Sequence, residues 1–133
     1  MSETRLFVYG TLMNDEVMSE LIGRIVESST ATLAEFKCLS VSGQSYPGIR
    51  PSKGSRVDGL LLHGLSRAEM KILDNYEGDQ YQLESVSVDV RVDRPVKCLT
   101  YVFKPEFYHQ LSDESWCNHA FRKNHLIAFT ADL

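Results

Sequence analysis

The sequence predicts an α+β protein built on a curved sheet or a small barrel. Strand candidates outnumber helix candidates along the chain, and the helix candidates lie between only some strands and at the C-terminal end. That order departs from the regular alternation of a parallel βαβ fold. The length of 133 residues fits one domain, expected to span residues 1–133.

Composition and charge are typical of a globular protein without a general affinity for nucleic acids or anionic membranes. Apolar residues are 43% and charged residues 24%, near the averages for folded domains. The net charge of −4 predicts no nucleic-acid or membrane partner. No apolar run approaches the roughly 18 residues of a membrane helix. Three cysteines without CxxC spacing predict free thiols, no metal site and a cytoplasmic location.

The N-terminal third predicts a strand followed by a short helix. The strand covers residues 6–9 and ends at Gly10. Asn14 suits the N-cap of the helix and Gly23 the position just past its end. The expected buried stripe of this helix is Val17, Met18, Leu21 and Ile22. A second strand is expected over residues 31–41.

The middle of the chain predicts two separate extended segments and a helix. Residues 46–51 contain two prolines, which places them on an edge or in a loop, and residues 57–63 form the next strand. Ser66 and Glu69 match a capping box. The helix after it should bury one side, formed by Leu65, Ala68, Ile72, Leu73 and Tyr76.

The C-terminal part predicts a hairpin and a last helix. Apolar residues change parity along the strand 81–92, which predicts a bulge near residues 84–85. Residues 93–95 should connect it to a strand over 96–103. A helix over about 113–131 should then bury Trp116, Cys117, Ala120, Phe121, Ile127 and Ala128.

Glu77 is the strongest candidate for chemistry. It ends a predicted helix beside Asp74 and Asp79, where the negative end of the helix dipole makes acids unfavourable. Neighbouring carboxylates, the dipole and any burial would raise its pKa, and a carboxyl tuned upward can carry a proton near neutral pH. The alternative is a solvated turn of acidic residues, a common surface feature.

Two further groups of residues could form a binding site. In the segment Tyr9-Gly10-Thr11-Leu12 a strand turns into a helix, and backbone N–H groups in such a turn can hold a carboxylate or an oxyanion. The alternative is an ordinary strand-to-helix turn. Tyrosines are core residues by default, although those with a solvated hydroxyl often line pockets. Cys38, Cys98 and Cys117 are expected to be small core residues.

Several segments together resemble the γ-glutamylcyclotransferase-like family, which includes the plant AIG2-like proteins. The matching segments are Leu6 to Leu12, Tyr46-Pro47-Gly48-Ile49, Val57-Asp58-Gly59 and Leu73 to Gly78, with Tyr81 and Tyr101. The resemblance covers about residues 5–104. It implies a small mixed β-barrel with flanking helices, and an enzyme that cyclises a γ-glutamyl group to 5-oxoproline and releases an amine. The helix expected at 113–131 lies outside it and should cover an edge or form an interface.

The resemblance also implies roles for individual residues. Glu77 looks like the catalytic carboxylate, acting as base and then as acid. The turn Tyr9-Gly10-Thr11-Leu12 would form the cradle for the glutamyl moiety. The pocket wall would include Tyr46, Tyr81 and Tyr101. No cofactor or metal is implied. Leu83 stands where many relatives carry Arg, and Arg50 is another cation that could face the cavity.

The leading hypothesis is therefore a monomeric or homodimeric cyclotransferase for a small γ-glutamyl amine or peptide. The alternative is a non-catalytic module that binds a small molecule or a partner in the same cavity, because fold alone does not imply function.

Overall fold

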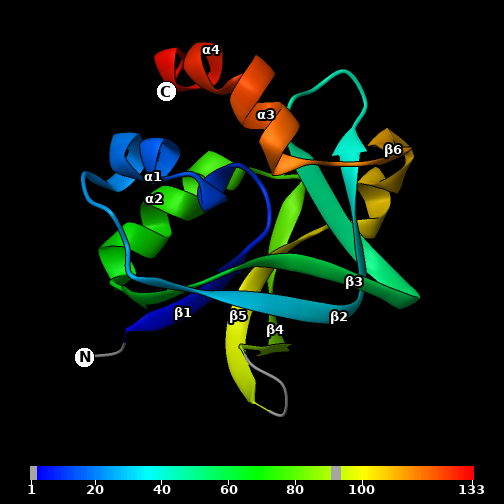
Figure 1. The fold of residues 1–133 in the computed structure, drawn as a ribbon, viewed down its shortest axis with the longest axis horizontal. Helices are drawn as coiled ribbons and strands as arrows, with labels where there is room; N and C mark the ends of the chain where they lie inside the picture. Colours follow the sequence, from blue (N-terminus) through cyan, green and yellow to red (C-terminus); the bar gives the residue numbers. More distant parts are fainter. Residues whose placement is uncertain (1–2, 91–93) are drawn as a thin grey trace.

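The computed structural model describes residues 3–90 and 94–133, and its centre is a closed, mixed β-barrel (Figure 1). The neighbouring strands follow the order β3-β1-β5-β4-β2, and pairing between β2 and β3 closes the barrel. β1 and β5 are parallel, whereas the other pairs are antiparallel. A further strand, β6, pairs with β2. The strands are β1 Thr4–Val8, β2 Ser28–Val41, β3 Pro47–Leu65, β4 Tyr81–Asp89, β5 Pro95–Phe103 and β6 Leu111–Ser115.

The α-helices gather beside the barrel, with α3 and α4 lying above α1 and α2 in Figure 1. The α-helices are α1 Asp15–Ile22, α2 Arg67–Glu77, α3 Asn118–Asn124 and α4 Leu126–Ala131, and the 3-10 turns are η1 Thr11–Met13 and η2 Pro105–Gln110. In the described chain, every helix is too short or too polar to cross a membrane.

Two apolar cores explain the alternation of side chains along the barrel strands. Phe7 of β1 packs inside the barrel, whereas Leu6 and Val8 face the layer beneath the helices. β4 serves both cores in turn, because Tyr81 packs toward the helices and Val88 into the barrel. Its pairing with β5 is continuous, without a register shift. The predicted bulge near residues 84–85 is therefore wrong, since the parity change needs only a strand with two covered faces.

The proline-rich segment 47–51 is neither a loop nor a separate strand. It begins the single long strand β3, which also contains the predicted strand 57–63. Residues 47–51 pair with β2, and β1 contacts β3 only from Leu60 onward. In the described pairings the prolines thus lie where β3 has one neighbour, which is where a sheet tolerates a missing N–H. The edge assignment is confirmed and the break between the two segments is wrong.

The two predicted helix starts turned out differently. The capping box of α2 is confirmed, because the Ser66 side chain accepts from the Glu69 N–H and Glu69 reaches back to the Ser66 N–H. The buried face is Leu65, Met70, Leu73 and Tyr76, whereas Ala68 and Ile72 are exposed. For α1, Gly23 adopts the left-handed C-cap (φ 78°) as predicted. Asn14 occupies the N-cap position, but its side chain does not cap the helix.

The predicted helix 113–131 is wrong in its N-terminal third and divided in the rest. Residues 111–115 pair with β2 as β6, and the helical part is divided between α3 and α4 at His125. Phe121 is buried and Trp116 is half-buried, but Cys117, Ala120, Ile127 and Ala128 are exposed. Cys117 is thus not a core residue, unlike Cys98, while Cys38 is half-buried. The connection predicted at 93–95 lies partly outside the described residues.

Candidate active site

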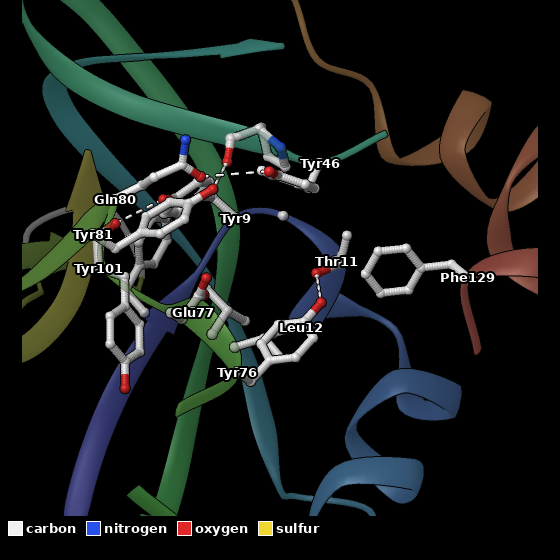
Figure 2. Close-up of a pocket in the computed structure, with 14 residues that line it drawn as sticks. Tyr9, Thr11, Leu12, Tyr46, Tyr76, Glu77, Gln80, Tyr81, Tyr101 and Phe129 are labelled. Atoms are coloured by element: carbon white, nitrogen blue, oxygen red, sulfur yellow. Dashed lines mark hydrogen bonds between the residues drawn. The ribbon is translucent and has the colours of Figure 1, made fainter. Parts of the chain in front are cut away.

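A pocket of about 190 Å³ opens beside the end of β1, at the C-terminal end of α2 (Figure 2). This is smaller than the roughly 300–1,000 Å³ of pockets for drug-sized ligands, which suits a small metabolite. All eight residues that the sequence analysis proposed for the site line it. The lining comprises Phe7, Val8, Tyr9, Gly10, Thr11, Leu12, Tyr46, Pro47, Tyr76, Glu77, Gln80, Tyr81, Tyr101 and Phe129.

Glu77 reaches this pocket because it is the last residue of α2. Gly78 ends the helix with a positive φ of 80°, and its N–H donates to the Asp74 carbonyl at 3.1 Å. This backbone conformation favours glycine. The Glu77 carboxyl points into the space between the turn after β1 and the tyrosines (Figure 2).

The environment of Glu77 favours its protonated form. Burial, followed by the charge of Asp74, raises the pKa of the Glu77 carboxyl from 4.5 to about 8. Among residues 3–90 and 94–133, no hydrogen bond to this carboxyl contributes to its pKa, so no hydrogen bond offsets the cost of its burial. The carboxyl can therefore gain or lose a proton close to neutral pH.

The turn 9–12 forms the wall opposite Glu77. The Met13 N–H donates to the Gly10 carbonyl at 3.0 Å, which starts the 3-10 turn η1. A Cβ at Gly10 would lie 2.8 Å from Cγ of Pro47, so this close approach requires glycine. The N–H groups of Thr11 and Leu12 have no acceptor in the described chain, as expected at the start of a helical turn. Such amides are suited to binding a carboxylate or an oxyanion.

Two of the tyrosines are fixed by hydrogen bonds to the main chain. The Tyr9 hydroxyl donates to the Tyr101 carbonyl at 2.7 Å, and the Tyr81 hydroxyl donates to the Pro47 carbonyl at 2.6 Å. Burial is the largest cause that raises the pKa of both phenols, with the Glu77 charge adding to it. They therefore stay neutral around neutral pH and form rigid walls of the pocket.

Tyr101 connects the pocket to the carboxylate beside Glu77. Its hydroxyl donates to Oδ1 of Asp74 at 2.5 Å. Burial, and then this hydrogen bond, raise the pKa of Tyr101 well above its usual value. The bond fixes Asp74, whose charge contributes to the raised pKa of Glu77. Tyr101 thus affects Glu77 indirectly, in addition to lining the pocket.

Sequence reasoning missed the pocket residues Gln80 and Phe129 and left Tyr76 with the core. The Tyr76 hydroxyl and Thr11 Oγ1 form a 2.6 Å hydrogen bond, and Gln80 accepts from the Tyr46 hydroxyl at 3.4 Å and donates to Gln110. Gln80 had a usable signal, since it lies between Glu77 and Tyr81 in the sequence. Phe129 had none, because only tertiary packing brings α4 to the pocket.

Leu83, which differs from the family pattern, and Arg50, which was expected as a cation that could face the cavity, both lie outside the pocket lining. Leu83 of β4 is 36% exposed. Arg50 does not face the cavity as the sequence suggested, because its guanidinium stacks 5.4 Å from the centre of the Tyr108 ring. No group of three His, Cys, Asp or Glu side chains in the described residues is placed to hold a metal ion.

The sequence matches the model of one protein family over most of its length. A sequence model described as "Gamma-glutamyl cyclotransferase, AIG2-like" matches residues 6–118. The chain therefore belongs to this family, as its motifs suggested. AIG2-like protein D of Arabidopsis thaliana is 36% identical over 117 residues, which span 84% of this chain and 77% of that protein.

Solved structures share the fold. A solution structure of an Arabidopsis thaliana protein has a TM-score of 0.73 and 26% identity, covering 99% of this chain and 80% of its own. A structure titled "Gamma-glutamyl cyclotransferase" has a TM-score of 0.67 at 16% identity, covering 98% of this chain and 86% of its own. At that identity it shows the fold alone, which confirms the barrel with flanking helices.

Proposed function

We propose that this protein is a γ-glutamyl cyclotransferase that converts a small γ-glutamyl amine or peptide to 5-oxoproline and a free amine. The observation that carries the proposal is the Glu77 carboxyl, which lies in one small pocket with the turn 9–12 and has a pKa near 8. Membership of the family supports a reaction of this kind.

In the proposed reaction Glu77 moves one proton. The α-ammonium group of the substrate gives a proton to the Glu77 carboxylate, and the neutral amine attacks the γ-carbonyl carbon. A C–N bond forms within the glutamyl group, the attacking nitrogen releases its second proton to solvent, and the C–N bond to the leaving amine breaks. Glu77 returns the proton to the leaving nitrogen, so a single carboxyl acts as base and then as acid. The products are 5-oxoproline and the free amine.

The rest of the pocket would hold the substrate for this step. The N–H groups of Thr11 and Leu12 would bind the α-carboxylate or the oxyanion that forms on the γ-carbonyl. The rigid walls made by Tyr9 and Tyr81 would keep the glutamyl chain folded. Because ring closure is intramolecular, holding the folded conformer provides a large part of the rate enhancement.

The test is release of 5-oxoproline from a panel of γ-glutamyl amines and peptides. We expect turnover by the natural protein and a loss of about a thousandfold in Glu77→Gln, the size expected for removing a general acid–base group. Asp79→Asn is the matched control, because Asp79 is an exposed acid two residues away that does not line the pocket. It should keep its turnover.

Two outcomes would contradict the proposal. Equal turnover by Glu77→Gln would remove Glu77 from the mechanism. No release across the panel by folded protein would favour the non-catalytic alternative, a module that binds a small molecule or a partner in this pocket.

A further inference from the structure

Two hydroxyl groups meet on the wall of the pocket. The hydroxyls of Thr11 and Tyr76 form a hydrogen bond of 2.6 Å, and both residues line the pocket. Figure 2 shows this pair between Glu77 and Phe129. Tyr76 directly precedes Glu77 at the end of α2, whereas Thr11 begins η1. The bond therefore joins the helix that provides the carboxyl to the turn on the opposite wall.

The pair has one hydroxyl proton more than its own hydrogen bond uses. Each hydroxyl carries one proton and also accepts, so the proton outside the bond can be donated to a ligand in the pocket. A phenol is a stronger acid than an aliphatic alcohol, which makes Tyr76 the favoured donor and Thr11 Oγ1 the acceptor. Burial raises the pKa of the Tyr76 phenol above its ordinary value, and the bond to Thr11 offsets part of this rise. The phenol therefore keeps its proton near neutral pH, and the proton available to a ligand is that of Thr11.

Both members of the pair are held in place by other contacts. Thr11 is 5% exposed, and its carbonyl accepts from the Asn14 side chain at 3.0 Å. The Tyr76 ring packs edge-on against Phe129, with centroids 6.3 Å apart at 79°. Phe129 packs in the same way against buried Phe121, with centroids 5.3 Å apart at 78°. The donor therefore has a fixed position, and this restricts the rotation of the hydroxyl that accepts from it.

We propose that Tyr76 is a positioning residue, whose hydroxyl holds Thr11 Oγ1 so that the Thr11 hydroxyl donates to the α-carboxylate of the substrate. The proposal rests on the cyclotransferase function, in which Glu77 takes a proton from the α-ammonium group. The α-carboxylate is attached to the same carbon as that ammonium group, so it must lie close to Glu77. The hydroxyl pair lies next to Glu77 on the way to Phe129 (Figure 2). A carboxylate has two oxygens and can accept from the hydroxyl as well as from N–H groups of the turn.

This role predicts an effect on binding rather than on the chemical step. The α-carboxylate keeps its charge from the bound substrate to the product, because the bonds that form and break lie elsewhere in the glutamyl group. Its hydrogen bond is therefore equally strong in the ground state and in the transition state. Removing such an interaction raises KM and leaves kcat unchanged.

A double-mutant cycle with Tyr76→Phe and Thr11→Val tests the order of the contacts. Each substitution removes one hydroxyl and nearly keeps the shape of the side chain. We expect KM for γ-glutamyl methylamide to rise about threefold in Tyr76→Phe and about tenfold in Thr11→Val, because the second variant loses a hydrogen bond to a charged group. The double variant should resemble Thr11→Val, since Tyr76 acts only through the Thr11 hydroxyl. In all three, kcat should stay within about twofold.

Two further variants separate positioning from general damage. Thr11→Ser keeps a hydroxyl, so it should retain a low KM and still respond to Tyr76→Phe. Tyr108→Phe is the matched control, because Tyr108 stacks on Arg50 and does not line the pocket. It should change neither KM nor kcat.

The role of Tyr76 can also be tested apart from turnover. L-Glutamine carries the same α-carboxylate and α-ammonium groups, and calorimetry would measure its binding to Glu77→Gln, alone and combined with each step of the cycle. The losses of affinity should follow the same order as the changes in KM. If no substrate is cyclised, the cyclotransferase proposal fails, and this binding cycle alone decides the role of Tyr76.

Four outcomes would overturn the proposal. They are losses that multiply in the double variant, a loss in Tyr76→Phe as large as that in Thr11→Val, a change confined to kcat, and no binding of L-glutamine by folded Glu77→Gln. The first two would mean that the Tyr76 hydroxyl contacts the ligand itself. The third would place the pair at the reacting carbonyl, and the fourth would remove the α-carboxylate from this wall.

Discussion

The pocket joins two regions of the molecule that are built in different ways. One region is the end of the barrel, where the turn after β1 faces the last residue of α2, and it provides Glu77, Thr11 and Leu12. The other is the C-terminal pair α3 and α4, which provides Phe129 and is fixed to the turn through Asn14. The first lies inside the family match, and the second lies almost wholly beyond it.

This difference suggests a division of work within one small cavity. The barrel end contains the groups proposed to move the proton and hold the charged glutamyl group. The C-terminal helices add the aromatic wall that Phe129 forms at the pocket. If the division holds, changes in the first region should alter the titration of Glu77 and the structure of the turn 9–12. Changes in the second should loosen the C-terminal helices, while the barrel stays intact.

The largest effect on stability should come from the charge of Glu77. Its pKa is about 8 in the folded chain and near 4.5 when unfolded. Between these values the folded protein binds one more proton, so the free energy of unfolding falls as pH rises. Relative to Glu77→Gln, the natural protein should lose up to about 1.4 kcal/mol per pH unit, and about 2.3 kcal/mol from pH 6 to pH 8, because the slope flattens as the pH nears the folded pKa. Urea unfolding of both proteins measures this, and parallel pH dependences would contradict it.

Gly10→Ala should disturb the barrel end by crowding. The new Cβ would meet the Pro47 ring at 2.8–3.0 Å, and overpacking of this kind costs about 2 kcal/mol. The displaced turn should also lower turnover, measured as 5-oxoproline release. Gly43→Ala is the control, because its positive φ of 76° makes alanine unfavourable at a site that does not line the pocket. Loss of stability without loss of turnover in Gly10→Ala would argue against a role for the turn.

Asn14→Ala should loosen the C-terminal region. It removes hydrogen bonds to the Thr11 carbonyl, Asn118 and Arg122 from a buried site, at a cost of about 1.5 kcal/mol. Amide hydrogen exchange over residues 118–131 should become faster, while that of β5 stays slow. Asn124→Ala, at the exposed end of α3, is the matched control. Unchanged exchange over α3 and α4 would show that Asn14 does not hold them.

Arg122→Ala should have the smallest effect. Arg122 and Glu16 form an ion pair whose side chains are 45% and 48% exposed. The substitution also removes one of the hydrogen bonds of Asn14 but leaves the other two in place. The pair lowers the pKa of Glu16 to about 2, mainly through the hydrogen bond, but exposed pairs contribute little to stability and are screened by salt. Thermal unfolding should show a smaller loss than in Asn14→Ala, and 0.5 M NaCl should reduce it. A loss larger than that of Asn14→Ala would reverse the order of the two contacts.

The same two regions differ in how far the sequence predicts them. At the barrel end the signals are local: a strand that stops at Gly10, a capping box at Ser66, and Gly78 directly after Glu77. Each was sufficient to place its element. The acidic helix end predicted the contribution of Asp74 to the raised pKa of Glu77, whereas the larger contribution comes from burial. The errors there came from tertiary context. The parity change in β4 reflects two covered faces, and the prolines of β3 are tolerated because that stretch pairs on one side.

The C-terminal region could not be predicted in this way. Residues 111–115 have no marked strand pattern and become β6 through pairing with β2. Phe121 and Leu126 both pack into the core beneath the helices. Their packing determines the division between α3 and α4 at His125 and the exposure of Ile127. Asn14 was expected to cap α1, but its side chain instead holds α3. Contacts between residues more than 100 positions apart leave no local trace in the sequence.

The most direct test of the central claim is the titration of the Glu77 carboxyl, followed by NMR in protein with ¹³C-labelled glutamate and assigned with Glu77→Gln. The measurement needs no knowledge of the substrate. The account predicts a pKa of about 8, so that the carboxyl can take and return a proton near neutral pH. A pKa near 4.5 would mean that Glu77 is an ordinary solvated acid, and would contradict its proposed role.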